Sequence, residues 1–154
     1  MSRQNVEIVR RAYKMFDDAG FSGAAGVDLG TFDTDIEVDT STRPSDADLF
    51  RGHDGLREFL SLQRGLWKRR LLEPQEFISV DEDRVVVATR IVSVGRNGVK
   101  VVSHSASVWT LDAGKIKHVK WFEHQGEALE AVGLSEWPTR EVERGGFESP
   151  TDGL

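Results

Sequence analysis

The stretch VWTLDAGKIKHVKWFEH, residues 108–124, carries two strand-like segments joined by an Asp-Ala-Gly turn. It also holds two tryptophans, two histidines and a glutamate. Side chains alternate between the two faces of a strand. Working outward, one face of these two strands carries Ser103, Ser105, Ser107, Trp109, Val119, Trp121 and Glu123, and the other carries His104, Ala106, Val108, His118, Lys120 and Phe122.

The neighbouring segments extend this hairpin into a longer meander. Asn97-Gly98 is a strong hairpin signal, because both residues tolerate the positive φ of a type I′ turn. The patterns predict strands near 35–40, 75–80, 84–95, 99–111 and 115–123. Pro74 is expected to separate the helix before it from the strand at 75–80. Residues 42–52, TRPSDADLFRG, are expected to form a loop.

Helical spacing precedes most of these strands. Residues 3–19 carry Val6, Val9, Tyr13 and Phe16 on one side, with Gly20 as the expected stop, and 53–69 forms a second amphipathic helix. Residues 21–31 are expected to be irregular or weakly helical, and a short helix is expected to end at Gly133. The sequence thus predicts one α+β domain over 1–134, and a polar, flexible tail over 135–154.

Composition excludes several functional classes. The 154 residues carry a net charge of −6, which gives no electrostatic basis for binding nucleic acid or an anionic membrane. The basic run at 68–70 is interpreted as the solvated end of a helix. No cysteine is present, so disulfides and thiolate sites are excluded. No stretch approaches 18 apolar residues, and we expect a cytoplasmic protein.

The order of four motifs resembles the nuclear transport factor 2-like superfamily, in its SnoaL-like, ketosteroid-isomerase-like branch. These motifs are NVEIVRRAYKMFDDAG, FDTDIEVDTS, FRGHDGLREFL and VWTLDAGKIKHVKWFEHQGEALEAVGL, which together cover roughly residues 3–134. The resemblance implies a roll in which a cone-shaped, curved antiparallel sheet wraps around helices, and it implies a homodimer. The branch includes isomerases, polyketide cyclases and hydrolases, so the fold alone does not choose the function.

The same resemblance assigns candidate catalytic residues. Tyr13 matches the tyrosine whose hydroxyl donates to a developing oxyanion in ketosteroid isomerases, although it could also be an ordinary core tyrosine. The matched positions of the two aspartates are Val38 and Ser107, which argues against steroid isomerisation itself. Asp39, next to Val38, would serve as the base only if the strand bulges there.

Two further charged residues are candidates. Aligned with the relatives, Arg90 points into the cone, where it would need an anion such as Asp39, Glu123 or a ligand carboxylate. Glu123 is the other possible base, because burial would raise the pKa of its carboxyl group. The competing interpretations are an arginine that extends to solvent and carboxylates that sit solvated on a rim.

The expected ligand site lies on the concave face of the sheet. Trp109 and Trp121 would form its walls, and His104 and His118 would lie on the convex face, toward solvent or a dimer partner. The four histidines show no metal-ligand spacing, so no metal and no cofactor is expected. The full set of expected ligand-binding residues is Trp67, Ser107, Trp109, Val119 and Trp121.

These residues predict a domain that binds a small hydrophobic molecule, with a homodimer as the expected assembly. If the protein is an enzyme, we expect an isomerase, cyclase or hydrolase without cofactor, in which a carboxylate moves the proton and Tyr13 or Arg90 stabilises the oxyanion. The alternative is a non-catalytic homodimeric binding or structural module whose cone is filled by its own side chains.

Overall fold

The structure is a computed structural model that describes residues 2–22, 28–40, 48–134 and 143–144. Its described strands form one sheet in the order β2-β1-β6-β5-β4-β3-β7. Within the same described residues, four helical segments accompany the sheet. The strand bounds are β1 Phe32–Asp39, β2 Leu49–Arg51, β3 Arg69–Ser79, β4 Arg84–Val94, β5 Lys100–Asp112, β6 Lys115–Phe122 and β7 Glu143–Arg144.

The sheet is mixed, whereas a wholly antiparallel sheet was expected. The neighbours β2–β1, β6–β5, β5–β4, β4–β3 and β3–β7 are antiparallel, but β1 pairs with β6 in parallel. A parallel pair needs a long connection between its strands. The chain between β1 and β6 contains a helix and four strands, so it supplies that connection.

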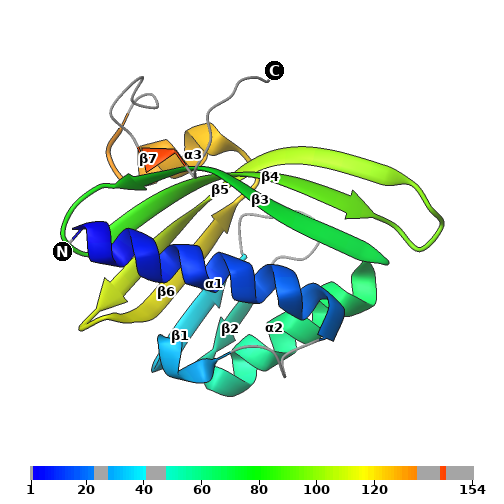
Figure 1. Cartoon of the computed structure of the whole chain (residues 1–154), viewed down its shortest axis with the longest axis horizontal. Helices are drawn as coiled ribbons and strands as arrows, with labels where there is room; N and C mark the ends of the chain where they lie inside the picture. Colours follow the sequence, from blue (N-terminus) through cyan, green and yellow to red (C-terminus); the bar gives the residue numbers. More distant parts are fainter. Residues whose placement is uncertain (1, 23–27, 41–47, 135–142, 145–154) are drawn as a thin grey trace.

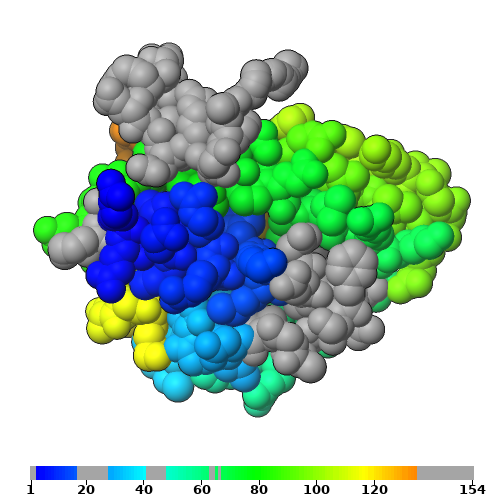
Figure 2. Space-filling model, viewed as in Figure 1, coloured from blue at the N-terminus to red at the C-terminus, as the bar shows by residue number. Residues whose placement is uncertain are grey.

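The helices lie on both sides of the sheet. The helix α1 (Ser2–Ser22) runs beneath the long strands β3, β4 and β5, which arch over it (Figure 1), and it covers this face in the space-filling view (Figure 2). The helix α2 (Gly52–Leu66) packs against β1, and the short 3-10 helix η2 (Leu29–Thr31) precedes β1. The helix α3 (Gln125–Ala131) follows β6 and packs on the opposite face.

Two separate apolar clusters show which residues occupy each face. The face toward α1, called here the inner face, holds the larger cluster, to which α1 contributes Val6, Val9, Tyr13 and Phe16. The opposite, outer face holds a smaller cluster formed by Val86, Ala106, Val108 and Phe122 with Ala128 and Val132 of the α3 region. Both faces of the central strands are therefore partly covered by helices.

Several element boundaries differ from the expected ones. The first helix continues past Gly20 to Ser22, and the second ends at Leu66. The strand β3 begins at Arg69, so Pro74 lies inside this strand and does not mark the expected boundary before it. The basic run at 68–70 is thus not a solvated helix end, because Arg69 and Arg70 belong to β3. Pro74 is accommodated because the β3–β4 register shifts between Pro74 and Glu76, and proline is tolerated at such irregularities. The segment expected to be a loop contains the short strand β2.

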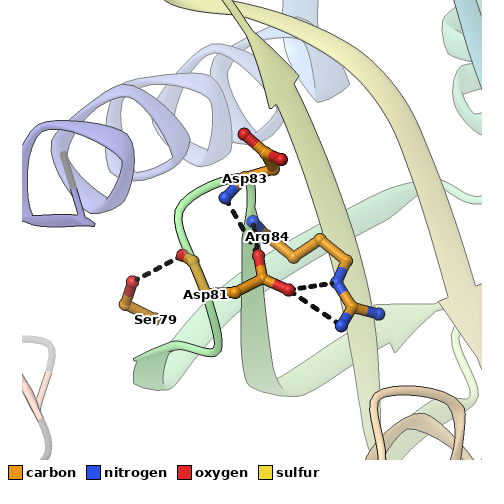
Figure 3. Close-up of polar contacts among 4 residues, drawn as sticks. All are labelled: Ser79, Asp81, Asp83 and Arg84. Carbon is orange, nitrogen blue, oxygen red and sulfur yellow. Dashed lines mark hydrogen bonds and ion pairs between the residues drawn. The ribbon is translucent and has the colours of Figure 1, made fainter.

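The turn between β3 and β4 is held by one carboxylate (Figure 3). The Oδ1 atom of Asp81 accepts the backbone N–H groups of Asp83 at 2.9 Å and Arg84 at 2.8 Å, and its Oδ2 atom accepts Arg84 Nε at 2.9 Å. The backbone hydrogen bond from Asp83 and the side chain of Arg84 lower the pKa of Asp81. The Nδ2 atom of Asn5 donates to the carbonyl oxygen of Glu82 at 2.7 Å, which ties α1 to this turn.

Of the expected tail, 135–154, the structure describes Glu143–Arg144, which form β7 at the edge of β3; the remainder lies outside the described residues. Residues 23–27 of the segment expected to be irregular lie outside them as well. None of the helices in the described part of the chain is long and apolar enough to cross a membrane.

Candidate functional site

Tyr13 lies at the centre of the inner face. Its side chain is 2% exposed and comes from the apolar stripe that α1 turns toward the sheet. The ring contacts Trp109, Trp121 and Phe77, with centroid distances of 5.3, 5.9 and 6.0 Å. A polar hydroxyl group is therefore carried into an otherwise aromatic part of the core.

The hydroxyl group of Tyr13 belongs to a buried hydrogen-bond network. Its Oη atom lies 2.6 Å from Thr89 Oγ1 on β4 and 2.8 Å from Ser107 Oγ on β5. Ser107 also accepts the indole N–H of Trp109 at 2.7 Å. Thr89, Ser107 and Trp109 are each 0% exposed, so the network is shielded from bulk water.

The network has one more proton than its internal bonds use. Three hydroxyl groups and one indole N–H provide four donor protons, while Tyr13, Thr89, Ser107 and Trp109 make three bonds among themselves. One hydroxyl proton is thus not used in the hydrogen bonds among these four residues. A buried donor without an acceptor costs about 1–3 kcal/mol, so an oxygen atom placed here would be favoured.

A second hydroxyl group on the same face lacks a hydrogen-bond partner within the described part of the chain. The Oγ atom of Ser105 is buried and makes no such bond, and Ser105 pairs across the strands with Thr89. Ser105 and Ser107 both face inward, because alternate residues of β5 share a face. The inner face therefore presents two donors to the same region.

Burial keeps Tyr13 neutral. Desolvation raises the pKa of its hydroxyl group to about 12, although the hydrogen bonds from Ser107, Thr89 and Trp109 act in the opposite direction. A neutral phenol is a hydrogen-bond donor. The arrangement is thus chemically suited to holding a carbonyl or another acceptor oxygen in an apolar surrounding.

The expected faces of the tryptophan strands are confirmed. Trp109, Val119 and Trp121 belong to the inner cluster with Tyr13, whereas Val108 and Phe122 belong to the outer one. The ring centroids of Trp109 and Trp121 lie 6.1 Å apart. That these residues contact a ligand stays a prediction.

Asp39 is placed away from Tyr13. The register between β1 and β6 is regular from Glu37 to Asp39, so no bulge turns Asp39 inward. Val38 is the inward residue and is fully buried. The carboxylate of Asp39 lies 3.9 Å from Lys120 Nζ, on the outer face. The conditional expectation that Asp39 serves as a base in the cone is therefore not met.

The inward orientation expected for Arg90 is wrong. Val85, Val87 and Thr89 of β4 contact the inner cluster or Tyr13, so the alternating Val86 and Arg90 face outward. Arg90 forms an ion pair with Glu73 of β3, at 2.5 Å, and the two side chains are 38% and 41% exposed. It extends on the outer face and does not reach Tyr13.

Glu123 and Trp67 lie just outside the ends of the regular elements. Glu123 is half-buried just after β6, two residues beyond Trp121. Trp67 is half-buried between α2 and β3, where the guanidinium carbon of Arg70 lies 5.4 Å from the centroid of its ring. Of the expected site residues, Tyr13, Ser107, Trp109, Val119 and Trp121 are brought together, and Asp39 and Arg90 are not.

Thr89 is a residue of this network that was not predicted from the sequence. Thr89 directly precedes Arg90, so an outward Arg90 would have implied an inward Thr89 beside the expected tyrosine. The need of a buried phenol for partners was the signal that pointed to such a residue. His104 pairs across the strands with the outward Arg90, and His118 lies 3.9 Å from Glu37, so both histidines occupy the outer face as expected. Within the described residues, no cluster of three or more histidines and carboxylates has metal-binding geometry.

No protein-family model and no curated protein matches this sequence. Solved structures match its fold. TerC, co-crystallised with polyporic acid, is 23% identical with a TM-score of 0.68, covering 84% of this chain and 97% of its own. An NTF2-like protein of unknown function from Burkholderia pseudomallei is 21% identical with a TM-score of 0.67, covering 85% and 98%. A protein from Jannaschia described provisionally as a SnoaL-like polyketide cyclase is 20% identical with a TM-score of 0.63, covering 89% and 95%.

Proposed function

Because the chain has the NTF2-like α+β roll fold that its sequence predicted, we propose that it binds a small, largely apolar molecule carrying an acceptor oxygen, which lies against the hydroxyl groups of Tyr13, Thr89 and Ser107. The observation that carries the proposal is the surplus donor in this buried network. Such networks are costly in an apolar interior unless every proton finds an acceptor. A ligand oxygen would supply that acceptor.

The surroundings of the network favour an aromatic or polycyclic ligand. Tyr13 is flanked by Trp109, Trp121 and Phe77, and aromatic side chains bind flat apolar molecules through large contact areas. Ligand sites in proteins commonly combine such apolar walls with a few convergent polar groups. In the alternative, in which side chains alone fill the interior, the buried hydroxyl group of Ser105 has no hydrogen-bond partner among the described residues.

The proposal is tested by comparing 2-acetylnaphthalene with 2-ethylnaphthalene, which has the same ring system and a similar size but no oxygen. Equilibrium dialysis against the full chain is expected to show at least fivefold tighter binding of the ketone, since one hydrogen bond contributes about 1 kcal/mol or more. Tyr13→Phe and Ser107→Ala are expected to reduce this preference. Glu127→Gln, an exposed change on α3, is the control.

Equal affinities of the wild-type chain for the ketone and the hydrocarbon would contradict the proposed role of the network. Failure of both compounds to bind would favour the interior filled by side chains. A preference for the ketone that survives in both Tyr13→Phe and Ser107→Ala would place the oxygen elsewhere.

A catalytic version of the same site has one supporting observation. Glu123 is half-buried and lies two residues beyond Trp121 in the chain, and the ring of Trp121 contacts that of the neutral donor Tyr13. In this version the carboxylate removes a proton next to the carbonyl while Tyr13 stabilises the enolate, as in an isomerase or cyclase without cofactor. Buried ionisable side chains other than Tyr13 are absent from the described core, so Glu123 is the candidate base.

This version is tested by proton exchange. The methyl protons of 2-acetylnaphthalene in deuterium oxide are followed by NMR with and without protein. Acceleration that is lost in both Glu123→Gln and Tyr13→Phe would support proton transfer. An unchanged exchange rate in the presence of a bound ketone would leave a binding domain without this chemistry.

A further inference from the structure

The tip of the β4–β5 hairpin carries an Asn-Gly pair in a different turn from the one expected. The N–H group of Gly98 donates to the carbonyl oxygen of Gly95 at 2.9 Å, so Arg96 and Asn97 are the central residues of the turn. Within the described part of the chain, the one non-glycine residue with positive φ is Ala113, so both central residues have negative φ, as in a type I turn. Gly98, with a φ of 89°, follows them. The type I′ turn expected for Asn97-Gly98 is therefore not formed.

An exposed asparagine that precedes a glycine can lose its amide group. The main-chain nitrogen of the glycine gives its proton to water and attacks the carboxamide carbon, whose bond to Nδ2 breaks, and the amide nitrogen takes up a proton and leaves as ammonia. Water then opens the cyclic imide at either carbonyl carbon, which yields aspartate or isoaspartate. Glycine favours the attack because it has no side chain and its backbone is permissive. Asn97 is exposed, and of the two asparagines in the chain it alone precedes a glycine.

Two hydrogen bonds oppose this reaction in the closed turn. The attacking nitrogen would be that of Gly98, whose N–H group is engaged with the carbonyl oxygen of Gly95. The Oδ1 atom of Asn97 accepts the N–H group of Val99 at 3.1 Å, which fixes the carboxamide. The nitrogen must lose its proton and the carboxamide must turn toward it, so both bonds have to open before the reaction.

The position of the carboxamide depends on the absence of a side chain at Gly95. A Cβ atom at this position would lie 2.9 Å from Asn97 Oδ1, which is too close, so one of the two groups would have to move. The end of the asparagine side chain is the group that can move. The φ of Gly95 is outside the left-handed region, so the backbone itself accepts an alanine there. Gly95→Ala is therefore a way to displace the carboxamide and keep the Asn-Gly pair.

The conversion would alter the contact between the hairpin tip and α2. The Nε atom of Arg96 donates to the carbonyl oxygen of Gly65 at 3.1 Å, which joins the two elements. Deamidation places a new carboxylate on the residue next to this arginine. Isoaspartate also lengthens the main chain of the turn, so the turn could not close as before.

We propose that Asn97 is a site of spontaneous deamidation whose rate is controlled by the fold of this hairpin tip. The closed turn preserves the asparagine, and each opening of the tip exposes it to conversion. This modification site is separate from the hydroxyl network of Tyr13 and requires no ligand.

The test follows the full chain in mildly alkaline buffer with and without urea. Peptide mass spectrometry measures the conversion of Asn97, and electron-transfer fragmentation identifies isoaspartate. The rate in the folded protein is expected to be roughly tenfold lower than in urea, because two hydrogen bonds must open first. Asn5 is the internal reference. It precedes Val6, its Nδ2 atom donates to the carbonyl oxygen of Glu82 at 2.7 Å, and it is expected to convert far more slowly than Asn97 in urea.

Gly95→Ala tests the role of the carboxamide position. The variant is expected to deamidate severalfold faster than the wild type when folded and at the same rate in urea, because the Asn-Gly pair is unchanged. Gly126→Ala is the matched control, since a Cβ atom there would meet no atom within 4 Å, and it is expected to keep the wild-type rate. Hydrogen exchange of the Gly98 amide shows whether the turn stays closed in each variant.

Each outcome bears on the proposal. Equal rates for Asn97 in the folded and the urea-unfolded wild type would overturn control by the fold. No conversion in urea would overturn the site itself. A wild-type rate in folded Gly95→Ala would overturn the role of the carboxamide position. A raised rate accompanied by fast exchange at Gly98 would support control by the fold through the opening of the turn.

Discussion

Tyr13 is the single tyrosine of the chain, so its ionisation can be followed by ultraviolet absorption without another phenol. Burial raises the pKa of its hydroxyl group to about 12. We expect the folded protein to show almost no tyrosinate at pH 10. Half-ionisation near pH 10 with the fold intact, judged by circular dichroism, would show that the hydroxyl group contacts water.

The same shift predicts a loss of stability in alkali. The pKa of Tyr13 is higher in the folded chain than its ordinary value near 10, so this contribution is complete below pH 10 and disappears as the pH rises toward 12. Each pKa unit corresponds to about 1.4 kcal/mol. Between pH 9 and pH 11, urea unfolding is expected to show a loss about 1 kcal/mol larger for the wild type than for Tyr13→Phe. Equal losses would contradict the burial of an ionisable hydroxyl group here.

Ser105 and Ser107 form a matched pair on one strand face. Ser107 accepts from Trp109 and contacts Tyr13, whereas the buried hydroxyl of Ser105 makes no hydrogen bond within the described residues. Ser107→Ala is expected to lower the free energy of unfolding by about 1–3 kcal/mol, because buried partners lose their bonds. Ser105→Ala is expected to be neutral or stabilising. Urea denaturation of both variants checks this, and a larger loss in Ser105→Ala would contradict the network.

The residues of the inner face could be predicted only where the pattern of polar and apolar residues, or a known relative, showed which residues of a strand point inward. The inward orientation of Trp109 and Trp121 followed from strand alternation together with the resemblance to known relatives, and it was correct. The strand around Arg90 reads VVVATRIVSV and is apolar on both faces, because α3 covers the outer one. With no polar marker, an error of one residue reverses the face of every side chain. Arg90 was misplaced for this reason.

At the scale of elements, the helices and the hairpins were predictable and the irregular strands were not. The amphipathic stripe of α1 and the turn at 112–114 follow directly from local pattern. The strand β3 contains Pro74, which is normally a breaker, and only the register shift beside it makes the strand possible. The parallel pairing of β1 with β6 depends on the whole path of the chain, and no local sequence pattern in either strand indicates it.

The β3–β4 turn gives a prediction at this scale. Asp81 has a lowered pKa, caused first by the backbone hydrogen bond from Asp83, so its stabilising contribution is present above pH 4 and disappears as the pH falls through the lowered value. The carboxylate is about half exposed, so Asp81→Ala is expected to cost less than about 1 kcal/mol at pH 7 and nothing near pH 2.

Asp83→Ala is the control for the turn. The substitution removes the same charge as Asp81→Ala. Asp83 contributes to the hydrogen bonds of the turn through its backbone, so these bonds remain after the substitution. Thermal unfolding at pH 7 is expected to distinguish the two variants. An equal effect of Asp81→Ala and Asp83→Ala would show that general charge, and not the hydrogen bonds of Asp81, holds the turn.

For the whole molecule, we propose that two copies associate through the outer face. The far ends of β4 and β5 project beyond the helices (Figure 1), and Val102, paired with Val92 on the outer face, is 43% exposed. Sedimentation equilibrium at micromolar concentration is expected to give about twice the 17.2 kDa chain mass. Val102→Glu is expected to weaken the dimer by placing a charge in the interface.

Val101→Glu is the control for assembly, since Val101 is 47% exposed but faces the inner side of the same strand. The dimer is expected to survive this change. A monomeric wild-type chain, or equal weakening by both substitutions, would contradict the proposed interface.

The carbonyl stretching frequency of a bound ketone reports whether the Tyr13 network donates to the ligand, because a hydrogen bond to the oxygen lowers that frequency. Isotope-edited infrared spectra of 2-acetylnaphthalene labelled with carbon-13 at the carbonyl are compared for the wild-type chain and Tyr13→Phe. A lower frequency in the wild type is expected, since the buried hydroxyl network donates to the ligand oxygen. The same frequency in both proteins, with the ketone bound, would show that Tyr13 and its partners do not hold it.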